Sequence, residues 1–287
     1  MGAAIAFVLA AAGHPVTVQD PNAEAVQRLP GEIARIADLL GVTAPTVTTG
    51  SFEDAVAGAT IVIEAGPEDK EIKQELFRRL DKIAPADAIL ATNTSAIPIK
   101  ELASVVGRPE RIVGTHFWNP PYAVELVEVV EAPQTNAAVV QRTIELLAAA
   151  SMKPVHVKRD VPGFVGNRLQ HALKREAIAL VEAGVCDAET IDTVVKAGFG
   201  SRLAVLGPLE QSDLVGLDLT LAIHTTLLGD LDVSPGPQRS LVERVERGDL
   251  GMRTGEGFRK WTPEEAQAVR DQFDAYLVEL ARSRRDT

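Results

Sequence analysis

Residues 1–20 read Met-Gly-Ala-Ala-Ile-Ala-Phe-Val-Leu-Ala-Ala-Ala-Gly-His-Pro-Val-Thr-Val-Gln-Asp. The first dozen are small and helix-forming, and Gly13 stands where a helix commonly ends in a glycine. Residues 16–19 predict a short strand that ends at Asp20. The stretch therefore predicts a helix, a tight turn, a strand and a terminal acid, in that order.

This order is that of the second half of a dinucleotide-binding βαβ unit. In such a unit an acid about twenty residues after the glycines of G-x-G-x-x-G binds the ribose hydroxyls of NAD. Gly2 would be the last of those glycines, the one that lets helix and strand pack closely, and Asp20 would be the acid. Asp20 could instead be a solvated acid at a strand end, but its place after residues 16–18 favours the cofactor role. An acid there also disfavours NADP, because it would repel the 2′-phosphate.

The first strand of the unit and its first two glycines are absent from this stretch. That strand is central in a doubly wound sheet, so its loss would expose apolar faces on both neighbouring strands. We therefore expect Met1 to be an internal methionine, with the natural start about a dozen residues upstream, the length of one strand and its turn. An in-frame stop codon immediately 5′ of this start would refute that expectation.

Strand and helix patterns alternate up to residue 157. Strands are predicted at residues 47–49, 60–65, 88–91, 111–115, 125–130 and 154–157. Helices are predicted at residues 22–41 (broken near Pro30-Gly31), 52–57, 70–83, 99–105 and 137–150. Helix 70–83 would bury one face made of Ile72, Leu76, Leu80 and Ile83. Such alternation predicts a parallel α/β sheet with binding sites at the carboxyl ends of its strands.

The strand pattern largely disappears after the stretch Asp-Val-Pro-Gly at residues 160–163. Helices are predicted at residues 164–182, 187–197, 209–228 and 263–284, with a surface loop at 231–237. We place a domain boundary near residue 158, which gives an α/β domain at 1–158 and an all-α domain at 159–287. A chain of 287 residues is long enough for two such cores.

The composition excludes several classes of protein. Long apolar runs are broken by charges, so we expect no membrane span. The formal charge of −11 argues against nucleic acid or an anionic membrane as the partner. The single cysteine, Cys186, excludes an internal disulfide and, without a signal peptide, predicts a cytoplasmic protein. The five histidines show no ligand-like spacing, so we expect no metal.

A second informative stretch, residues 114–121, reads Gly-Thr-His-Phe-Trp-Asn-Pro-Pro, and Glu128 follows the histidine by twelve residues. The two prolines force a turn. Residues 124–130 predict a strand that could run back towards His116. An imidazole can accept a proton near neutral pH, and a carboxylate on its other nitrogen would fix the tautomer. Taken alone, a histidine beside aromatic residues is more often structural; the accompanying motifs favour a base.

Together these motifs resemble the 3-hydroxyacyl-CoA dehydrogenase family over nearly the whole chain. The motifs are Ala-Thr-Asn-Thr-Ser at 91–95, Gly-Thr-His-Phe-x-Asn-Pro with a glutamate at plus twelve, and Asp-x-Pro-Gly-Phe-x-x-Asn-Arg at 160–168. The resemblance implies that His116 takes the hydroxyl proton of a secondary alcohol and that Glu128 orients it. It also implies NAD as cofactor, a Rossmann-like domain followed by a helical domain, and a homodimer formed through the helical domain.

The resemblance further implies that Ser95 contacts the substrate hydroxyl and that Asn167 polarises the substrate. From the residues alone, both side chains could equally cap the helices that follow. Other positions match those where the family touches NAD. They are Asp20, Ala65, Glu68, Lys73, Asn93 and Asn119. Apart from the family, Lys73 would be an ordinary exposed helix residue, and Glu68 is ambiguous.

The chain departs from acyl-CoA members of the family at residues 198–208. Those members usually carry Gly-Tyr-Pro-Met-Gly-Pro, whereas this chain has Gly-Phe-Gly-Ser-Arg-Leu-Ala-Val-Leu-Gly-Pro. With Trp118 and Pro121, this longer form resembles relatives that act on small free acids: gulonate and carnitine dehydrogenases, λ-crystallin and a pyridine-carboxylate dehydrogenase. Arg202 could grip a substrate carboxylate or form a salt bridge at a surface or domain interface.

The substrate therefore stays open between a 3-hydroxyacyl-CoA, as in fatty acid metabolism, and a small hydroxy acid or pyridine carboxylate. The crystallin relatives leave a non-catalytic structural protein as another alternative. The presence of both His116 and Glu128 argues against that alternative.

Overall fold

In a computed structural model, which describes residues 1–283, the chain forms two compact units. Unit 1 comprises residues 1–168 together with the chain from Phe273 onward, and unit 2 comprises residues 169–272. The chain passes between the units inside two helices, α7 (Gly166–Glu182) and α12 (Pro263–Ser283). The boundary near residue 158, drawn from the sequence, stays a prediction. The last residue of the predicted helix 263–284 lies outside the described residues.

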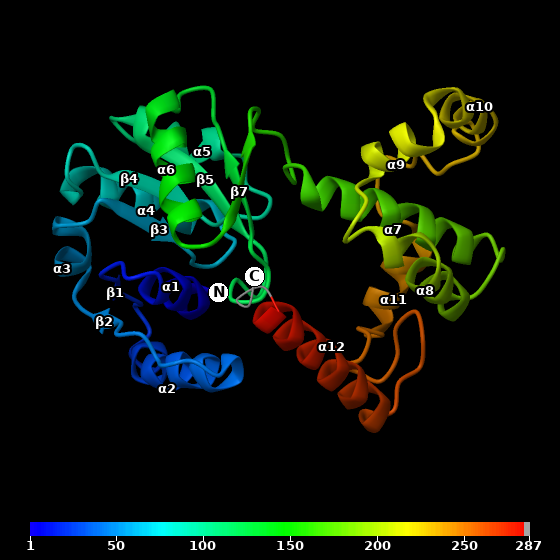
Figure 1. The fold of residues 1–287 in the computed structure, drawn as a ribbon, viewed down its shortest axis with the longest axis horizontal. Coiled ribbons are helices and arrows are strands. Elements are labelled where there is room, and N and C mark those ends of the chain that lie inside the picture. Colours follow the sequence, from blue (N-terminus) through cyan, green and yellow to red (C-terminus); the bar gives the residue numbers. More distant parts are fainter. Residues whose placement is uncertain (284–287) are drawn as a thin grey trace. The chain divides into compact units, whose positions relative to one another are not determined.

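Unit 1 is built on a five-stranded sheet in chain order (Figure 1). Its strands are β3 (Ile61–Glu64), β4 (Ile89–Thr92), β5 (Ile112–Phe117), β6 (Leu126–Val130) and β7 (Lys153–Val157). The first three are parallel, whereas β6 runs antiparallel to β5 and β7 runs parallel to β6. The sheet is therefore mixed rather than wholly parallel, because only a short turn, and no helix, joins β5 to β6.

Two further strands form a separate parallel pair, β1 (Thr17–Val18) and β2 (Thr48–Thr49). Among the described residues, this pair is not hydrogen-bonded to the five-stranded sheet. Helix α1 (Gly2–Ala11) precedes β1 and is followed by Gly13 at φ +87°, a value that glycine adopts readily.

Helices cover both faces of the larger sheet (Figure 1). One face packs against α3 (Phe52–Ala57), α4 (Lys70–Ile83) and α5 (Ile99–Ala103). The other face packs against α1 and α6 (Ala137–Ala149). Successive strand residues alternate between the two cores, so Leu90 joins the first while Ile89 and Ala91 join the second. The predicted Rossmann-like, doubly wound α/β fold is confirmed.

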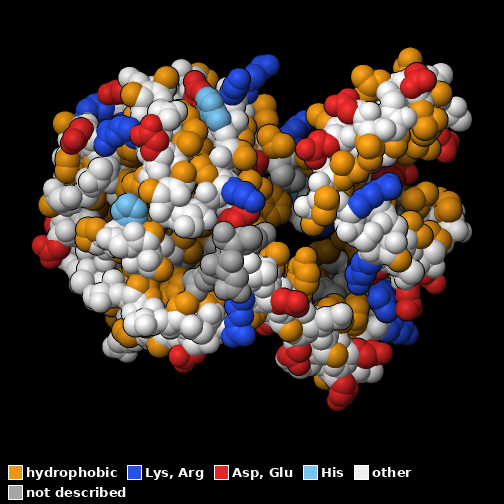
Figure 2. All heavy atoms as spheres, viewed as in Figure 1, with side chains coloured by type: hydrophobic (Ala, Val, Ile, Leu, Met, Phe, Trp, Pro, Cys, Tyr) orange, Lys and Arg blue, Asp and Glu red, His pale blue; other side chains and the backbone are white. Residues whose placement is uncertain are grey.

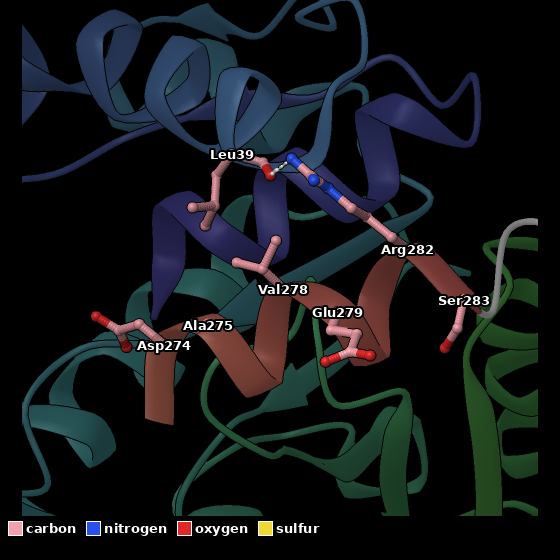
Figure 3. A pocket seen from close by; sticks show the side chains of 7 residues that line it. All are labelled: Leu39, Asp274, Ala275, Val278, Glu279, Arg282 and Ser283. Atoms are coloured by element: carbon pink, nitrogen blue, oxygen red, sulfur yellow. Dashed lines mark hydrogen bonds between the residues drawn. The ribbon is translucent and has the colours of Figure 1, made fainter. Parts of the chain in front are cut away.

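A third core cluster joins α1 to α2 (Ala23–Leu40) and to the end of α12. Phe7 of α1, Ile33 and Ile36 of α2, and Leu277 and Ala281 of α12 are buried in it. Helix α1 is apolar on every side because it is enclosed between this cluster and the sheet. Arg282 of α12 donates a hydrogen bond to the carbonyl of Leu39 at 2.9 Å (Figure 3).

Two predicted helices of unit 1 differ from those observed. Helix α2 continues through Pro30, because the side chain of Asn22 caps its start and Gly41, at φ +68°, ends it. The buried face of α4 was predicted only in part. Leu80 is buried and Leu76 packs against the core, but Ile72 and Ile83 are exposed, and Lys73 and Phe77 are buried instead. The buried face includes Lys73, which forms a buried charge pair described below that apolar spacing does not reveal.

Unit 2 is helical, as predicted. Besides α7 it contains α8 (Ala188–Ala197), α9 (Pro208–Val215), α10 (Leu217–Leu227) and α11 (Arg239–Arg247). The single helix predicted at 209–228 is wrong, because the chain breaks at Gly216, where φ is +99°. Helix α11 was not predicted. Helices α8 to α11 contain no buried residue, and no helix in the described part of the chain is long and apolar enough to cross a membrane.

Candidate active site

The candidate residues of unit 1 gather at the carboxyl ends of β3, β4 and β5. Because these strands are parallel, the segments that follow them leave the sheet at the same edge. Asn93 connects the three strand ends. Its amide N–H donates to the carbonyl of Glu64 at 2.8 Å, and its side-chain oxygen accepts from the amide N–H of Phe117, also at 2.8 Å. Ala65, Glu68, Ser95 and Asn119 lie in the segments that follow these strands.

His116 and Glu128 face one another across the antiparallel pair β5–β6. They are register partners, and Nδ1 of His116 lies 2.8 Å from Oε2 of Glu128. An ionised carboxylate can only accept, so Nδ1 is the donor, and in the neutral imidazole Nε2 carries the lone pair. Nε2 has no hydrogen-bond partner within residues 1–283. The predicted return of the chain towards the histidine is confirmed.

Aromatic rings enclose this histidine. The ring of Phe164 lies 5.5 Å from the His116 ring and that of Trp118 lies 5.8 Å from it, both tilted. Phe164 is fully buried although its φ is +50°, a value that few residues other than glycine adopt. Gly166 must be small because an added Cβ would lie 2.3 Å from Cζ2 of Trp118. These contacts leave His116 only 5% exposed.

The second oxygen of Glu128 holds the start of α7. Oε1 accepts from the amide N–H groups of Val165 at 2.9 Å and Gly166 at 3.0 Å. Burial raises the pKa of Glu128, but the hydrogen bond from His116 and those from the two backbone amides outweigh it and lower the pKa overall. The carboxylate is therefore ionised at neutral pH and can accept the hydrogen bond from Nδ1 of His116.

The backbone of Ser95 is held in place by hydrogen bonds to its amide and its carbonyl. Oε1 of Glu68 accepts from the hydroxyl of Thr94 at 2.6 Å and from the amides of Ser95 and Ala96, both at 2.9 Å. The side-chain amide of Asn167 donates to the carbonyl of Ser95 at 3.2 Å. The structure thus brings together Ser95 and Asn167, two residues far apart in the sequence.

Lys73 is not the exposed helix residue that the sequence suggested. Its side chain is 1% exposed, and its ammonium donates to both oxygens of Glu64 at 2.7 and 2.8 Å. Glu64 also accepts from the Thr92 hydroxyl at 2.7 Å and from the Gly66 amide at 2.6 Å. Lys73 therefore serves as the internal counter-ion of Glu64. Glu64 was missed by sequence analysis because a single acid at the end of a buried strand carries no distinctive pattern.

The residues around β1 fit part of an NAD site. Asp20 is exposed directly after β1, and its Oδ1 accepts only the local amide of Asn22 at 2.8 Å. Such a carboxylate can bind ribose hydroxyls. The first amides of α1 are free to bind an anion. Gly2 begins α1, but an added Cβ there would meet nothing within 4 Å, so the close packing expected of it is not observed among the described residues.

Arg202 lies in unit 2, at the end of a short 3₁₀ helix formed by residues 199–202. Its side chain is exposed and forms no ion pair with any described residue, so the alternative of a salt bridge within its own unit is not observed. Its role stays a prediction. No group of His, Cys, Asp and Glu suited to a metal occurs within residues 1–283.

Comparison with known proteins agrees with this geometry. Residues 1–161 match the family description "3-hydroxyacyl-CoA dehydrogenase, NAD binding domain", and residues 163–261 match its C-terminal domain. The 5-formyl-3-hydroxy-2-methylpyridine 4-carboxylate 5-dehydrogenase of Mesorhizobium japonicum is 36% identical, over 98% of this chain and 94% of its own length.

Two solved structures are also similar. A crystal structure of an enzyme of that same specificity, described as an NAD⁺-dependent dismutase, has a TM-score of 0.92 and 36% identity, and covers 98% of this chain and 94% of its own. The (S)-3-hydroxybutyryl-CoA dehydrogenase of Ralstonia eutropha has a TM-score of 0.74 and 30% identity, and covers 91% of this chain and 95% of its own. The chain therefore belongs to the 3-hydroxyacyl-CoA dehydrogenase family of NAD-dependent oxidoreductases.

Proposed function

We propose that this protein oxidises the secondary alcohol of a 3-hydroxyacyl-CoA-type substrate to a ketone, with His116 as the base. The observation that carries the proposal is the 2.8 Å contact between Nδ1 of His116 and Oε2 of Glu128, which makes Nε2 the proton acceptor of the neutral imidazole. Nε2 takes the hydroxyl proton while the C–H bond of the same carbon breaks and the C=O bond forms. Bound NAD supplies the hydride acceptor. Glu128 stabilises the resulting imidazolium.

Ser95 and Asn167 orient the substrate oxygen in this proposal. The hydroxyl of Ser95 forms no hydrogen bond with any described residue, so it is free to contact the alcohol. Asn167, at the start of α7, would donate to the oxygen on which charge develops. Support comes from their proximity, since the Asn167 amide lies 3.2 Å from the Ser95 carbonyl.

NAD would be held at the same edge of the sheet. We assign the ribose hydroxyls to Asp20, and further contacts to Gly2, Ala65, Asn93 and Asn119. The predicted contacts of Glu68 and Lys73 have weaker support, since both side chains are engaged within the protein.

The test is to replace each member of the pair and to compare it with a similar pair outside the site. His116→Gln and Glu128→Ala should each lower kcat at least about a hundredfold, the usual contribution of a positioned base, while NAD still binds. His156 and Glu131 form a second pair, 2.7 Å apart and partly exposed. His156→Gln and Glu131→Ala should leave kcat unchanged. Near-normal turnover in His116→Gln would refute the proposal.

A small free acid is the second candidate substrate, as a hydroxy acid or a pyridine carboxylate. It is favoured by the likeness to the pyridine-carboxylate dehydrogenase, whose structure has a higher TM-score than the butyryl-CoA enzyme and covers more of this chain. The departure at residues 198–208 supports the same candidate. Turnover of acetoacetyl-CoA should be compared with that of free hydroxy acids and pyridine carboxylates. If Arg202→Ala loses activity only towards free acids, the second candidate is correct.

We also propose a cytoplasmic homodimer that pairs through unit 2. Exposed apolar side chains of α9 and α10 support the pairing; they include Leu209, Leu214, Leu217, Leu221 and Ile223. In Figure 2, hydrophobic side chains are prominent on the surface of these helices. Such a concentration is typical of a surface covered by another chain.

The presence of both His116 and Glu128 speaks against a purely structural, crystallin-like role.

A further inference from the structure

Glu68 concentrates three hydrogen bonds on one oxygen atom. Oε1 accepts from the Thr94 hydroxyl and from the backbone amides of Ser95 and Ala96, at 2.6 to 2.9 Å. Hydrogen bonds to an ionised acceptor are roughly twice as strong as neutral ones. The segment that leaves β4 is therefore tied to the segment that leaves β3 by a single carboxylate.

The surroundings keep this carboxylate charged. Partial burial raises the pKa of Glu68, but the hydrogen bonds from Thr94, Ala96 and Ser95, together with the charge of Lys73, lower it overall. Nζ of Lys73 lies 3.7 Å from Oε2 of Glu68 and is itself held by the buried Glu64. The buried pair of Lys73 and Glu64 thus places a fixed positive charge next to the carboxylate of Glu68.

Ser95 is held from both sides while its side chain stays free. Glu68 accepts a hydrogen bond from its amide N–H, and the side-chain amide of Asn167 donates one to its carbonyl. The exposed hydroxyl has no partner among the described residues. This is the arrangement needed to present a hydroxyl to a substrate, because the backbone cannot rotate away.

We propose that Glu68 is a positioning residue that acts through Ser95: its carboxylate holds the Ser95 turn in the geometry needed for substrate contact. The inference rests on the proposed substrate role of Ser95. It differs from the assignment of Glu68 as a direct contact of NAD. In that assignment Glu68 would govern NAD affinity; as a positioning residue it governs the turnover of the alcohol.

Three variants of the full-length protein separate these roles. Glu68→Ala removes the anchor, whereas Glu68→Gln keeps an oxygen that can accept the two amide N–H groups. We expect Glu68→Ala to lower kcat/KM for the alcohol at least about tenfold, the effect of a lost hydrogen bond to a charged group, with the Kd of NAD unchanged. Glu68→Gln should recover most of the activity. Glu101→Gln, which breaks an exposed ion pair with Lys70, is the matched control and should be neutral.

Hydrogen exchange of the Ser95 and Ala96 amides gives a readout independent of activity. Glu68→Ala should lose their protection, while Ser95→Ala should retain that of Ala96. In activity, the double variant Glu68→Ala, Ser95→Ala should be no worse than Ser95→Ala alone. A raised Kd for NAD with unaltered exchange in Glu68→Ala would overturn the proposal, as would fully additive losses. If Ser95→Ala were as active as the parent, the proposed contact of Ser95 with the substrate would be refuted. Loss of amide protection in Glu68→Ala would then show only that Glu68 holds the backbone of Ser95 and Ala96.

Discussion

At the scale of single residues, motifs predict pairs within one hairpin but not pairs between separate segments. His116 and Glu128 could be paired from the sequence because one turn joins their strands, so register alone brings them together. The pair between Lys73 and Glu64 could not, since it joins the first turn of a helix to the end of the preceding strand. A buried charge interrupts apolar spacing in the same way as a solvated one. The prediction that Lys73 is an exposed helix residue was wrong for that reason.

Removing Lys73 should be far more costly than removing its exposed neighbour. Lys73→Met leaves Glu64 as an unpaired buried charge, so we expect unfolding by urea to show a loss of about 3–5 kcal/mol. Lys70 forms an exposed pair with Glu101, and Lys70→Met should lose about 0–1 kcal/mol. Equal losses in the two variants would contradict the buried-pair account.

Glu128 should make a pH-dependent contribution to stability. Its pKa is lowered by folding, so the contribution is complete above its ordinary value of 4.5 and is lost as the pH falls through the lower, folded value. The difference in unfolding free energy between the parent and Glu128→Gln should therefore shrink when urea titrations move from pH 6 to below pH 4.5. Glu131→Gln is the control for general acid effects. If the difference in unfolding free energy instead grew as the pH fell, the pKa of Glu128 would not be lowered by folding.

At the scale of elements, strands and their order were predictable, whereas helix ends and faces depended on particular residues. Helix α1 is apolar throughout, and the sequence alone could not say that it is enclosed by two cores. Helix α2 survives Pro30 because good caps and a buried face outweigh one missing hydrogen bond. Gly216 has the opposite effect, since its positive φ ends α9 where leucines continue on both sides.

The end of α12 should stabilise unit 1. Leu277 is 7% exposed in the cluster shared with α1 and α2, whereas its neighbour Tyr276 is 57% exposed. Leu277→Ala should cost about 2–5 kcal/mol in unfolding free energy through the lost burial and the cavity left behind. Tyr276→Ala should cost within about 0.5 kcal/mol, as surface changes usually do. Calorimetry of both variants tests the assignment; a neutral Leu277→Ala would contradict the packing of α12 in this cluster.

At the scale of the whole molecule, unit 2 exposes more apolar surface than an isolated domain usually does. Its helices α8 to α11 have no fully buried residue. Small domains need buried apolar area to be stable, and the dimer proposed above would supply it. The sequence predicted the helices and, through the family resemblance, the pairing; it did not indicate which helices would be left uncovered.

A charge placed on this surface should separate the two copies. Leu221, on α10, is 67% exposed, and Leu221→Asp would bury a carboxylate in the proposed interface. Analytical ultracentrifugation should then give the mass of one chain for the variant and of two for the parent. Val233, which is 79% exposed in the loop after α10, provides the control Val233→Asp, expected to stay paired. A monomeric parent protein would refute the proposal.

The two crossings inside α7 and α12 make unit 2 an insertion within unit 1, which holds both the first helix and the last. The match to the NAD-binding family description ends at residue 161. A fragment that stopped there would lack Leu277 and Ala281, and the surfaces of α1 and α2 in the cluster they share with α12 would become more exposed to solvent. To excise the nucleotide-binding half intact, residues 1–168 would have to be spliced to those from 273 onward. Proteolytic nicking of unit 2, conversely, should leave that half held together by packing alone.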